Sequence, residues 1–408
     1  MTFEKLGLTP RLTARLAELG MSLPTPIQAR AIPEALKGRD VLGLAQTGTG
    51  KTASFGLPLL NALIGKERAE PKTVHALVLA PTRELAMQIH AVLMDLAAGA
   101  NRPRIGLVVG GRSLGPQADM LFRGTEILVA TPGRLIDLID RKAVRLNTAK
   151  FLVLDEADQM LDLGFIHALR RIAALLPKAR QTMLFSATMP KLMAELAGAY
   201  LTDPVRIEVA PPGKAADKVT QAVHFVSAGD KQALLIDLLD AHRGDRALVF
   251  ARTKHGAEKL MKNLDKAGFA ASSIHGNKSQ GQRTRALTEF REGKIRVLVA
   301  TDVAARGIDI PGVEYVYNFE LPNVPENYVH RIGRTARAGA EGRAVALCAA
   351  DEMGDLKAIE KLLGTKVPVA GGVAWAGRSP AGNAPKKPSG ASRPRRPGGR
   401  RPAPKRAA

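Results

Sequence analysis

Residues 45–52, AQTGTGKT, combine glycine, threonine and lysine at the spacing of a phosphate-binding loop. The loop follows an apolar segment, DVLGLA (40–45), and precedes a second one, ASFGLPLLNALI (53–64). A strand, a loop and a helix in this order are the context that such a loop requires. Its first residue is Ala45, where the commonest pattern has Gly.

The residue types in this loop predict specific roles towards a nucleoside triphosphate. Gly48 and Gly50 would let backbone N–H groups approach the phosphates. Lys51, expected to face solvent, would reach the β- and γ-phosphates, and the hydroxyl of Thr52 would hold Mg²⁺.

A pair of carboxylates strengthens this prediction. The stretch LVLDEAD (152–158) places Asp155 and Glu156 after an apolar strand, about 100 residues beyond the loop. Asp155 would bind Mg²⁺, partly through water, and Glu156 would orient and deprotonate the attacking water. The alternative is an acidic surface turn, which becomes improbable when it occurs together with the loop.

A second group that could grip phosphate lies far downstream, in HRIGRTARAG (330–339). Planar guanidinium groups such as those of Arg334 and Arg337 suit a γ-phosphate whose charge spreads in the transition state. Because hydrolysis would then need both stretches, we expect two domains that close on one nucleotide. A purely RNA-binding role for this cluster is the alternative.

Composition restricts the class of protein. The net charge of +22 over 408 residues points to a polyanionic partner, usually nucleic acid. One cysteine, Cys348, excludes an intramolecular disulfide and a cysteine-rich zinc site. The N-terminus has no apolar signal core and no long apolar run occurs, so a cytoplasmic protein without a membrane association is expected. Aromatic residues make up only 4%, which disfavours binding by base stacking.

Short apolar segments alternate with helical patterns along the chain, as in doubly wound α/β domains with parallel sheets. The expected strands cover 40–45, 75–80, 104–109, 126–131, 151–156, 182–188 and 205–210, and then 221–226, 246–251, 295–301, 313–319 and 343–349. The sequence ILVAT (127–131) is echoed by VLVAT (297–301), which is a weak sign of duplication.

Composition also predicts the domain limits. We expect the first domain to consist of the segment 1–30 together with residues 31–210. Residues 211–218 would form a linker, and residues 219–370 would form a second domain. Residues 371–408 contain ten Lys or Arg, seven Pro, seven Gly and no acidic residue. We expect this tail to be disordered, because it cannot form a core.

Taken together, DEAD (155–158), SAT (186–188) and HRIGRTAR (330–337) resemble the motifs of the DEAD-box ATP-dependent RNA helicases. The similarity spans roughly residues 3 to 345, and HGNKSQGQR (275–283) with the basic tail resembles the bacterial RhlE-type subgroup. The resemblance implies two tandem RecA-like domains, ATP and Mg²⁺ as cofactors, and RNA-stimulated ATP hydrolysis.

The resemblance extends to the nucleotide site. GMSLPTPIQ (20–28) is similar to the Q motif, in which Gln28 would hydrogen-bond the adenine edge and Phe3 would stack on the base. For Phe3, packing of the terminus onto the core is the alternative. Further nucleotide-binding residues would be Ala45, Gln46, Thr47, Gly48, Thr49, Gly50, Lys51, Thr52, Gly307 and Asp309.

The resemblance also implies RNA contacts and a coupling group. RNA-backbone contacts would come from Pro81, Thr82, Arg83, Gly110, Gly111, Thr131, Pro132, Gly133, Arg134, Arg252, Thr253, Gln280, Arg283 and Thr301. Phosphate contacts of this kind position a strand without reading its sequence. Nucleotide state would be coupled to strand separation by Asp158, Ser186, Ala187, Thr188 and His330, with Ser186 and Thr188 hydrogen-bonding towards Asp158.

The sequence therefore predicts an RNA helicase that binds single strands by their backbone and locally unwinds short duplexes or remodels RNA–protein complexes. Ribosome or RNA-decay assemblies are the partners expected. Two alternatives stay open: an RNA clamp gated by ATP, in which strand separation is incidental, and a DNA helicase with the same core.

Overall fold

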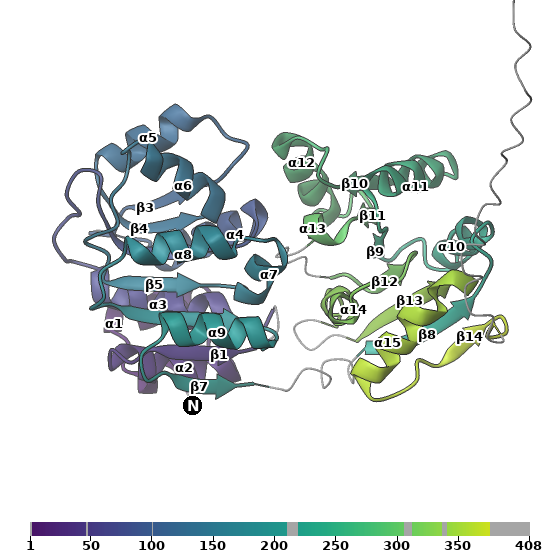
Figure 1. Cartoon of the computed structure of the whole chain (residues 1–408), viewed down its shortest axis with the longest axis horizontal. Helices are drawn as coiled ribbons and strands as arrows, with labels where there is room; N and C mark the ends of the chain where they lie inside the picture. Colours follow the sequence, from purple (N-terminus) through teal and green to yellow (C-terminus); the bar gives the residue numbers. More distant parts are fainter. Residues whose placement is uncertain are drawn as a thin grey trace, which may run out of the picture. The chain divides into compact units, whose positions relative to one another are not determined.

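The computed structural model describes residues 2–45, 48–99, 101–209, 219–305, 312–336 and 341–375. These residues form two seven-stranded sheets, and every described strand pair is parallel (Figure 1). The first sheet contains β1 (Val41–Leu44), β2 (Val74–Leu79), β3 (Ile105–Val108), β4 (Thr125–Ala130), β5 (Phe151–Leu154), β6 (Gln181–Ser186) and β7 (Val205–Glu208). The second contains β8 (Val219–Phe225), β9 (Ala247–Phe250), β10 (Ala271–Ile274), β11 (Val297–Ala300), β12 (Tyr315–Asn318), β13 (Gly342–Cys348) and β14 (Val369–Gly371).

Helices cover both faces of the first sheet. One face packs against η1 (Phe3–Leu6), α1 (Pro10–Glu18), α2 (Pro26–Leu36), α3 (Lys51–Leu63) and α4 (Arg83–Leu96). The other packs against α5 (Leu114–Phe122), α6 (Pro132–Asp140), α7 (Ala157–Asp162), α8 (Ile166–Ala174) and α9 (Lys191–Tyr200). Successive residues of a strand point to opposite faces of the sheet and so pack in different hydrophobic cores. Val153 packs in the core of the first face, whereas Leu152 and Leu154 pack in the core of the second.

The second sheet is covered in the same way. Helices α10 (Lys231–Asp240) and α11 (Lys254–Lys266) pack on one face. The other face carries α12 (Gln280–Arg291), α13 (Asp302–Ala305), α14 (Pro325–Ile332) and α15 (Met353–Leu363), with η3 (Ala350–Glu352) between β13 and α15. The predicted fold class, two doubly wound α/β units, is confirmed.

The two sheets have the same strand order. It is β3-β4-β2-β5-β6-β1-β7 in the first and β10-β11-β9-β12-β13-β8-β14 in the second, so each strand corresponds to the strand seven places later. The echoed segments ILVAT and VLVAT begin within β4 and β11, which occupy the same place in their sheets. The weak sequence repeat therefore marks a genuine structural repeat.

Two strands were not predicted. The sequence of β10 is ASSI, which lacks an apolar run, and β14 has only three residues. Because β14 pairs with β8 and ends at Gly371, the second sheet extends one residue into the predicted tail. The predicted linker 211–218 and nearly all of the tail lie outside the described residues.

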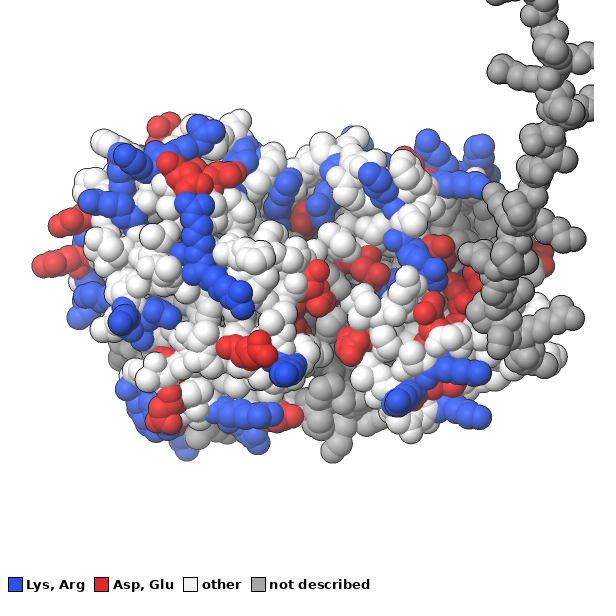
Figure 2. Space-filling model, in the orientation of Figure 1, with Lys and Arg blue, Asp and Glu red and all other residues white. Residues whose placement is uncertain are grey.

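Two further expectations concern charge and membranes. Figure 2 shows Lys and Arg side chains over the helices of both sheets, interspersed with Asp and Glu, so the basic character extends beyond the tail. Within the described ranges, no helix has both the length and the apolarity to cross a membrane.

Candidate functional site

Three of the loops singled out by sequence meet at one edge of the first sheet. The strands β5, β6 and β1 are neighbours in that order, and the carboxyl ends of parallel strands lie at the same edge. Leu44 stands opposite Ser186, and the backbone N–H of Ala45 donates to the Ser186 carbonyl at 3.0 Å. The phosphate loop therefore adjoins the SAT segment, with the DEAD segment on the next strand.

The phosphate loop has the backbone shape of an anion site. Gly48 and Gly50 both have φ of 87°, a left-handed conformation that glycine adopts without steric cost. Helix α3 begins immediately afterwards at Lys51, and its first turn contains no acidic residue. A helix N-terminus of this kind favours bound phosphate through its free N–H groups and its dipole.

Lys51 does not face solvent, contrary to expectation. Its side chain is 5% exposed, and Nζ donates to the carbonyl of Ala45 at 2.9 Å. The ammonium group therefore lies folded back under the loop. Thr52, in contrast, is only partly buried.

Gln28 connects the second helix to the phosphate loop. Its Oε1 accepts from the Thr25 backbone N–H at 2.9 Å, which is the glutamine half of a capping box at the start of α2. Its Nε2 donates to the Gly50 carbonyl at 3.1 Å. A Cβ on Gly50 would lie 2.4 Å from this Nε2, so the contact requires glycine. The amide keeps one N–H and one lone pair for a further partner.

Phe3 lies in the hydrophobic core. It is 4% exposed and packs in the cluster formed by η1 and helices α1 to α4. A ring this buried has little surface for stacking on a base. The structure therefore favours the alternative, in which Phe3 anchors the N-terminal segment.

The carboxylates of the DEAD segment are buried. Asp155 and Glu156 are each 2% exposed, and burial raises the pKa of Asp155, an effect that Lys51 opposes and Glu156 adds to. A bound cation would relieve this cost by stabilising the ionised carboxylate. Glu156 has φ of 51°, an uncommon left-handed backbone conformation for a residue with a large side chain, and is the N-cap residue that precedes α7. With the loop donors, these groups fit a nucleotide and its Mg²⁺ ion.

Asp158 links the DEAD and SAT segments. Its Oδ2 accepts from the Ala187 N–H at 3.1 Å, the Thr188 N–H at 3.0 Å and the Thr188 hydroxyl at 3.0 Å. The predicted hydrogen bond of Thr188 is thus present. The one predicted for Ser186 is wrong, because its hydroxyl donates to the Thr188 carbonyl at 2.7 Å and so shapes the turn itself.

The predicted RNA contacts of the first sheet gather beside this site. They follow β2, β3 and β4, which are adjacent in the order β3-β4-β2. Arg83 lies against Gly111, where an added Cβ would come within 2.1 Å of its guanidinium. Thr82 caps α4 by accepting from the Leu85 N–H at 3.3 Å, and Arg134 donates to the Arg112 carbonyl at 2.9 Å. Pro81, Gly110 and Thr131 lie in the same three loops, and Pro132 and Gly133 are the first two residues of α6.

The second sheet repeats this arrangement. Thr253 follows β9, Gln280 and Arg283 follow β10, and Thr301 follows β11, which are neighbours in the order β10-β11-β9. Arg252 is held by Glu352 Oε1 at 3.2 Å and by the Leu321 carbonyl at 3.0 Å. The predicted RNA residues of the second domain therefore also share one sheet edge.

The arginine cluster divides into different environments. Arg331 is 1% exposed, and it bonds both carboxylate oxygens of Asp302, at 2.6 and 2.8 Å, and Asn318 at 3.0 Å. It is therefore a structural residue. Arg334 is 4% exposed, and its Nε donates to the His330 carbonyl at 3.2 Å. Ala336 has φ of 55°, a conformation that costs a residue with a Cβ roughly 1–2 kcal/mol.

Five of the predicted site residues lie outside the described residues. They are Gln46, Thr47, Gly307, Asp309 and Arg337.

Comparison with known proteins shows which family has this arrangement. The DEAD/DEAH box helicase model matches residues 25–196, and the helicase conserved C-terminal domain model matches residues 230–339. The chain is 45% identical over 360 residues to the DEAD-box ATP-dependent RNA helicase CshA of Bacillus cereus, which covers 88% of this chain and 68% of that protein. The chain is a DEAD-box ATP-dependent RNA helicase. It is also 46% identical over 367 residues to the ATP-dependent rRNA helicase rrp3 of Aspergillus terreus, covering 90% and 81% of the two chains.

Solved DEAD-box structures support the same conclusion. Dbp5 of S. cerevisiae bound to RNA and ADP BeF3 has a TM-score of 0.81 and 33% identity, and the match covers 90% of this chain and 95% of that one. Mss116p bound to ssRNA and AMP-PNP also has a TM-score of 0.81, at 28% identity, covering 91% and 80%. This DEAD-box helicase therefore uses a nucleotide and binds RNA.

Two supporting residues of the DEAD-box helicase were not predicted from its sequence. Asp302 fixes Arg331, and Glu352 receives Arg252, Lys231 and two backbone N–H groups. Their side-chain partners Arg331, Arg252 and Lys231 are distant in sequence, so no local pattern could have indicated these contacts. The capping box at Thr25 and Gln28 was detectable, because Ser or Thr followed three residues later by Glu or Gln is its signature.

Proposed function

We propose that this helicase divides its chemistry between the two halves of its first sheet edge. The β5-β6-β1 half would bind and hydrolyse ATP, and the β3-β4-β2 half would hold the RNA backbone together with the matching β10-β11-β9 edge of the second sheet. The proposal rests on the hydrogen bonds between Asp158 and the SAT turn, because they join the DEAD and SAT segments into one unit at the nucleotide half.

The proposal is tested by measuring ATP hydrolysis with single-stranded RNA and single-stranded DNA side by side, together with unwinding of a short RNA duplex. Strong stimulation by RNA and unwinding that requires ATP are expected. Equal stimulation by DNA would favour the DNA helicase, and tight ATP-dependent RNA binding without unwinding would favour the clamp.

In the nucleotide site, Lys51 would bind the β- and γ-phosphates, and Thr52 and Asp155 would hold Mg²⁺, Asp155 partly through water. The ion, when bound, neutralises the charge that develops on the phosphate oxygens. Before it can reach phosphate, the Lys51 ammonium must leave the Ala45 carbonyl. Glu156 would orient the attacking water and take its proton. The left-handed backbone of Glu156, immediately before α7, sets the direction of its side chain.

Hydrolysis would be completed by groups of the second domain. Arg334 and Arg337 would act on the γ-phosphate when the domains close, with Gly307 and Asp309 touching the nucleotide and His330 contributing to coupling. RNA bound by both domains would favour closure, so hydrolysis would be stimulated by RNA. Release of phosphate would then reopen the protein.

RNA would be bound through its sugar–phosphate backbone. Thr82, Arg83, Gly111, Thr131 and Arg134 supply hydroxyl, guanidinium and backbone N–H donors at one edge, which suits phosphate contacts. Contacts to the 2′-hydroxyl would distinguish RNA from DNA.

Loss of adenine recognition is expected when Gln28 is replaced by Ala. The variant loses the acceptor for Thr25 N–H, the donor to the Gly50 carbonyl and the proposed adenine contact. The ATP preference over GTP should fall about two- to twelvefold, since one hydrogen bond is worth about 0.5–1.5 kcal/mol. Hydrolysis rates with both nucleotides measure this. Gln28→Glu, which keeps the acceptor, is the matched control for the helix cap, and equal use of ATP and GTP by the wild type would overturn the role.

Uncoupling is expected for Thr188→Val. The change removes one of three hydrogen bonds to Asp158 Oδ2 and retains the side-chain shape. About 1 kcal/mol of coupling should be lost, so duplex unwinding per ATP hydrolysed should fall about fivefold. Ser186→Ala is the control, because that hydroxyl does not touch Asp158. Equal losses in the two variants would show that the turn, and not the Asp158 contact, matters.

The basic tail is proposed to be an RNA tether. Truncation after Trp375 removes all ten basic residues of the tail and spares β14. If about five of these charges meet phosphates, the log–log slope of RNA affinity against salt should flatten by roughly 3.5. The rate at saturating RNA should stay close to that of the full chain. Superimposable salt titrations of the two proteins would mean that the tail serves solubility alone.

Three finer assignments belong to the same proposal. The stretch 275–283 and the basic tail support membership of the RhlE-type subgroup. A sequence-independent RNA-binding core suits work on ribosomal or decaying RNA in larger assemblies. The cytoplasm is the compartment proposed, and fractionation of cells with an antibody against the protein would test it.

A further inference from the structure

A pocket lies at the edge of the first sheet opposite the proposed ATP and RNA edge. Its lining comes from residues before β2, from the segment between α6 and β5, and from the end of α8, so it stands at the amino ends of these strands. Its volume is about 630 Å³, within the range of sites that bury a drug-sized ligand. None of the residues proposed for ATP or RNA lines it.

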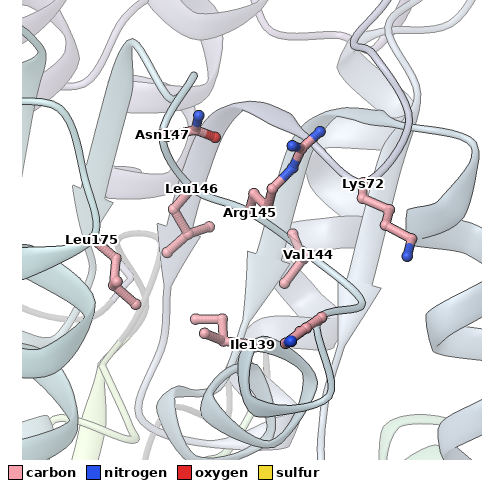
Figure 3. Close-up of a pocket in the computed structure, with 8 residues that line it drawn as sticks. Lys72, Ile139, Val144, Arg145, Leu146, Asn147 and Leu175 are labelled. Carbon is pink, nitrogen blue, oxygen red and sulfur yellow. The ribbon is translucent and has the colours of Figure 1, made fainter.

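The pocket has an apolar floor and a cationic border. Figure 3 shows Ile139, Val144, Leu146 and Leu175 pointing into a common space. Val144 and Leu146 are nearly fully buried and belong to the core, whereas Leu175 is 42% exposed. A single exposed leucine is common on protein surfaces, but here Leu175 adjoins an apolar pocket floor, and an apolar side chain of a ligand could cover both.

The charged side chains that line the pocket are all cationic. Lys72, Lys142 and Arg145 contribute to its lining, and no carboxylate does. Asp140, which ends α6 nearby, is already paired with Arg171, which lowers the pKa of the Asp140 carboxyl. The border therefore favours an anionic ligand.

The walls are held in place by an unusual backbone. Lys72 has φ of 62° and Lys142 has φ of 55°, both left-handed conformations that are strained for lysine. Each is fixed by hydrogen bonds: Lys142 N–H to the Ile139 carbonyl and Arg145 N–H to the Lys72 carbonyl, both at 2.8 Å. A pocket fixed in this way loses little conformational freedom when it is filled.

We propose that this pocket is a docking site for an acidic peptide segment of a partner protein, with Leu or Phe side chains on the apolar floor and flanking carboxylates at Lys72, Lys142 and Arg145. Its volume exceeds that of one side chain, so a short segment fits better than a single anchor. Because the site lies across the sheet from the proposed ATP and RNA edge, a bound partner leaves that edge accessible.

Other occupants fit the chemistry less well. Residues 371–408 of this chain carry ten basic and no acidic side chains, so the cationic border repels them. A second copy of the chain has a net charge of +22 and is disfavoured for the same reason. RNA phosphates could meet the cationic border, but they would leave the apolar floor of the pocket uncovered, so RNA uses only part of the site.

The test selects peptides of about 12 residues, a length suited to a short groove-binding segment, from a random display library against the full-length protein with ATP and RNA present. Enriched peptides should combine Leu or Phe with Asp or Glu. Their affinity, measured by fluorescence anisotropy, should fall at least about tenfold, or 1.4 kcal/mol, in the Lys142→Glu/Arg145→Glu variant and in Leu175→Glu. Arg141→Glu, an exposed neighbour that does not line the pocket, is the matched control and should change affinity much less.

RNA-stimulated hydrolysis at saturating RNA should be unchanged in all three variants, which also shows that they fold. The proposal is overturned if no peptide is enriched, if the enriched peptides are basic or uncharged, or if the pocket variants bind the peptides as tightly as the wild type does. It is equally overturned if the double variant instead weakens binding of a short single-stranded RNA, because the cations would then belong to an RNA surface.

Discussion

Replacing Arg334 with Ala is expected to lower RNA-stimulated ATP hydrolysis by about 10³-fold or more, with little change in ATP affinity. The expected size is that of an arginine finger, about 10³–10⁵ in rate, and it falls mainly on turnover because such a group acts in the transition state. Steady-state hydrolysis at saturating RNA, together with binding of a fluorescent ATP analogue, measures the two quantities separately.

Burial of Arg334 makes a folding control necessary. The side chain is 4% exposed and its Nε donates to the His330 carbonyl, so thermal unfolding of the variant must be compared with that of the wild type. Arg334→Lys keeps a charge without the planar fork and should remain strongly impaired. Arg285→Ala is the surface control, because that side chain is 81% exposed. Full turnover with reduced RNA affinity in Arg334→Ala would make the cluster an RNA site.

The Glu156→Gln variant should bind ATP and RNA but hydrolyse ATP about 10²–10⁴ times more slowly, which is the usual contribution of a general base. The amide preserves the size of a residue that is 2% exposed and precedes α7 in a left-handed conformation. The complex with RNA and ATP should therefore persist. Dissociation of labelled RNA after addition of unlabelled competitor measures its lifetime.

The same experiment without ATP provides the control, because RNA should then leave the variant and the wild type at similar rates. Glu195→Gln, an exposed substitution on α9, controls for loss of one negative charge. Normal turnover with an unchanged RNA off-rate would exclude Glu156 as the base.

Much of the fold could be predicted, because the patterns that indicate strands and motifs lie within short stretches of the sequence. Buried parallel strands such as β5, β9 and β11 are continuous apolar runs, and this pattern is readable in any window of the sequence. The phosphate loop and the DEAD segment are equally local, since each keeps its reactive residues within a few positions. Strand β10 was missed for the same reason, because ASSI carries no apolar run and is recognised only by pairing with β11.

Side-chain environments were harder to predict, because they depend on partners distant in sequence. Lys51 was expected in solvent but bonds Ala45, and Phe3 was expected on the base but packs into the core. Arg331 and Arg334 are three residues apart in one motif, yet Arg331 bonds Asp302 and Asn318, whereas Arg334 Nε donates to the His330 carbonyl. Spacing along the chain cannot distinguish them.

The grouping of residues into motifs and the alternation of strands and helices can both be read along the chain, and they are sufficient to indicate the DEAD-box family. The strand order became known from the folded protein alone. It separates β3-β4-β2 from β5-β6-β1 and so divides six loops between a proposed RNA half and a proposed nucleotide half. The tertiary structure also decided that Asp158 holds Thr188 and that Lys142, Arg145 and Leu175 surround one pocket. The physical reason is that sheet order and pocket walls arise from pairing and packing between segments far apart in the chain, and a local pattern of side chains does not encode which segments become neighbours.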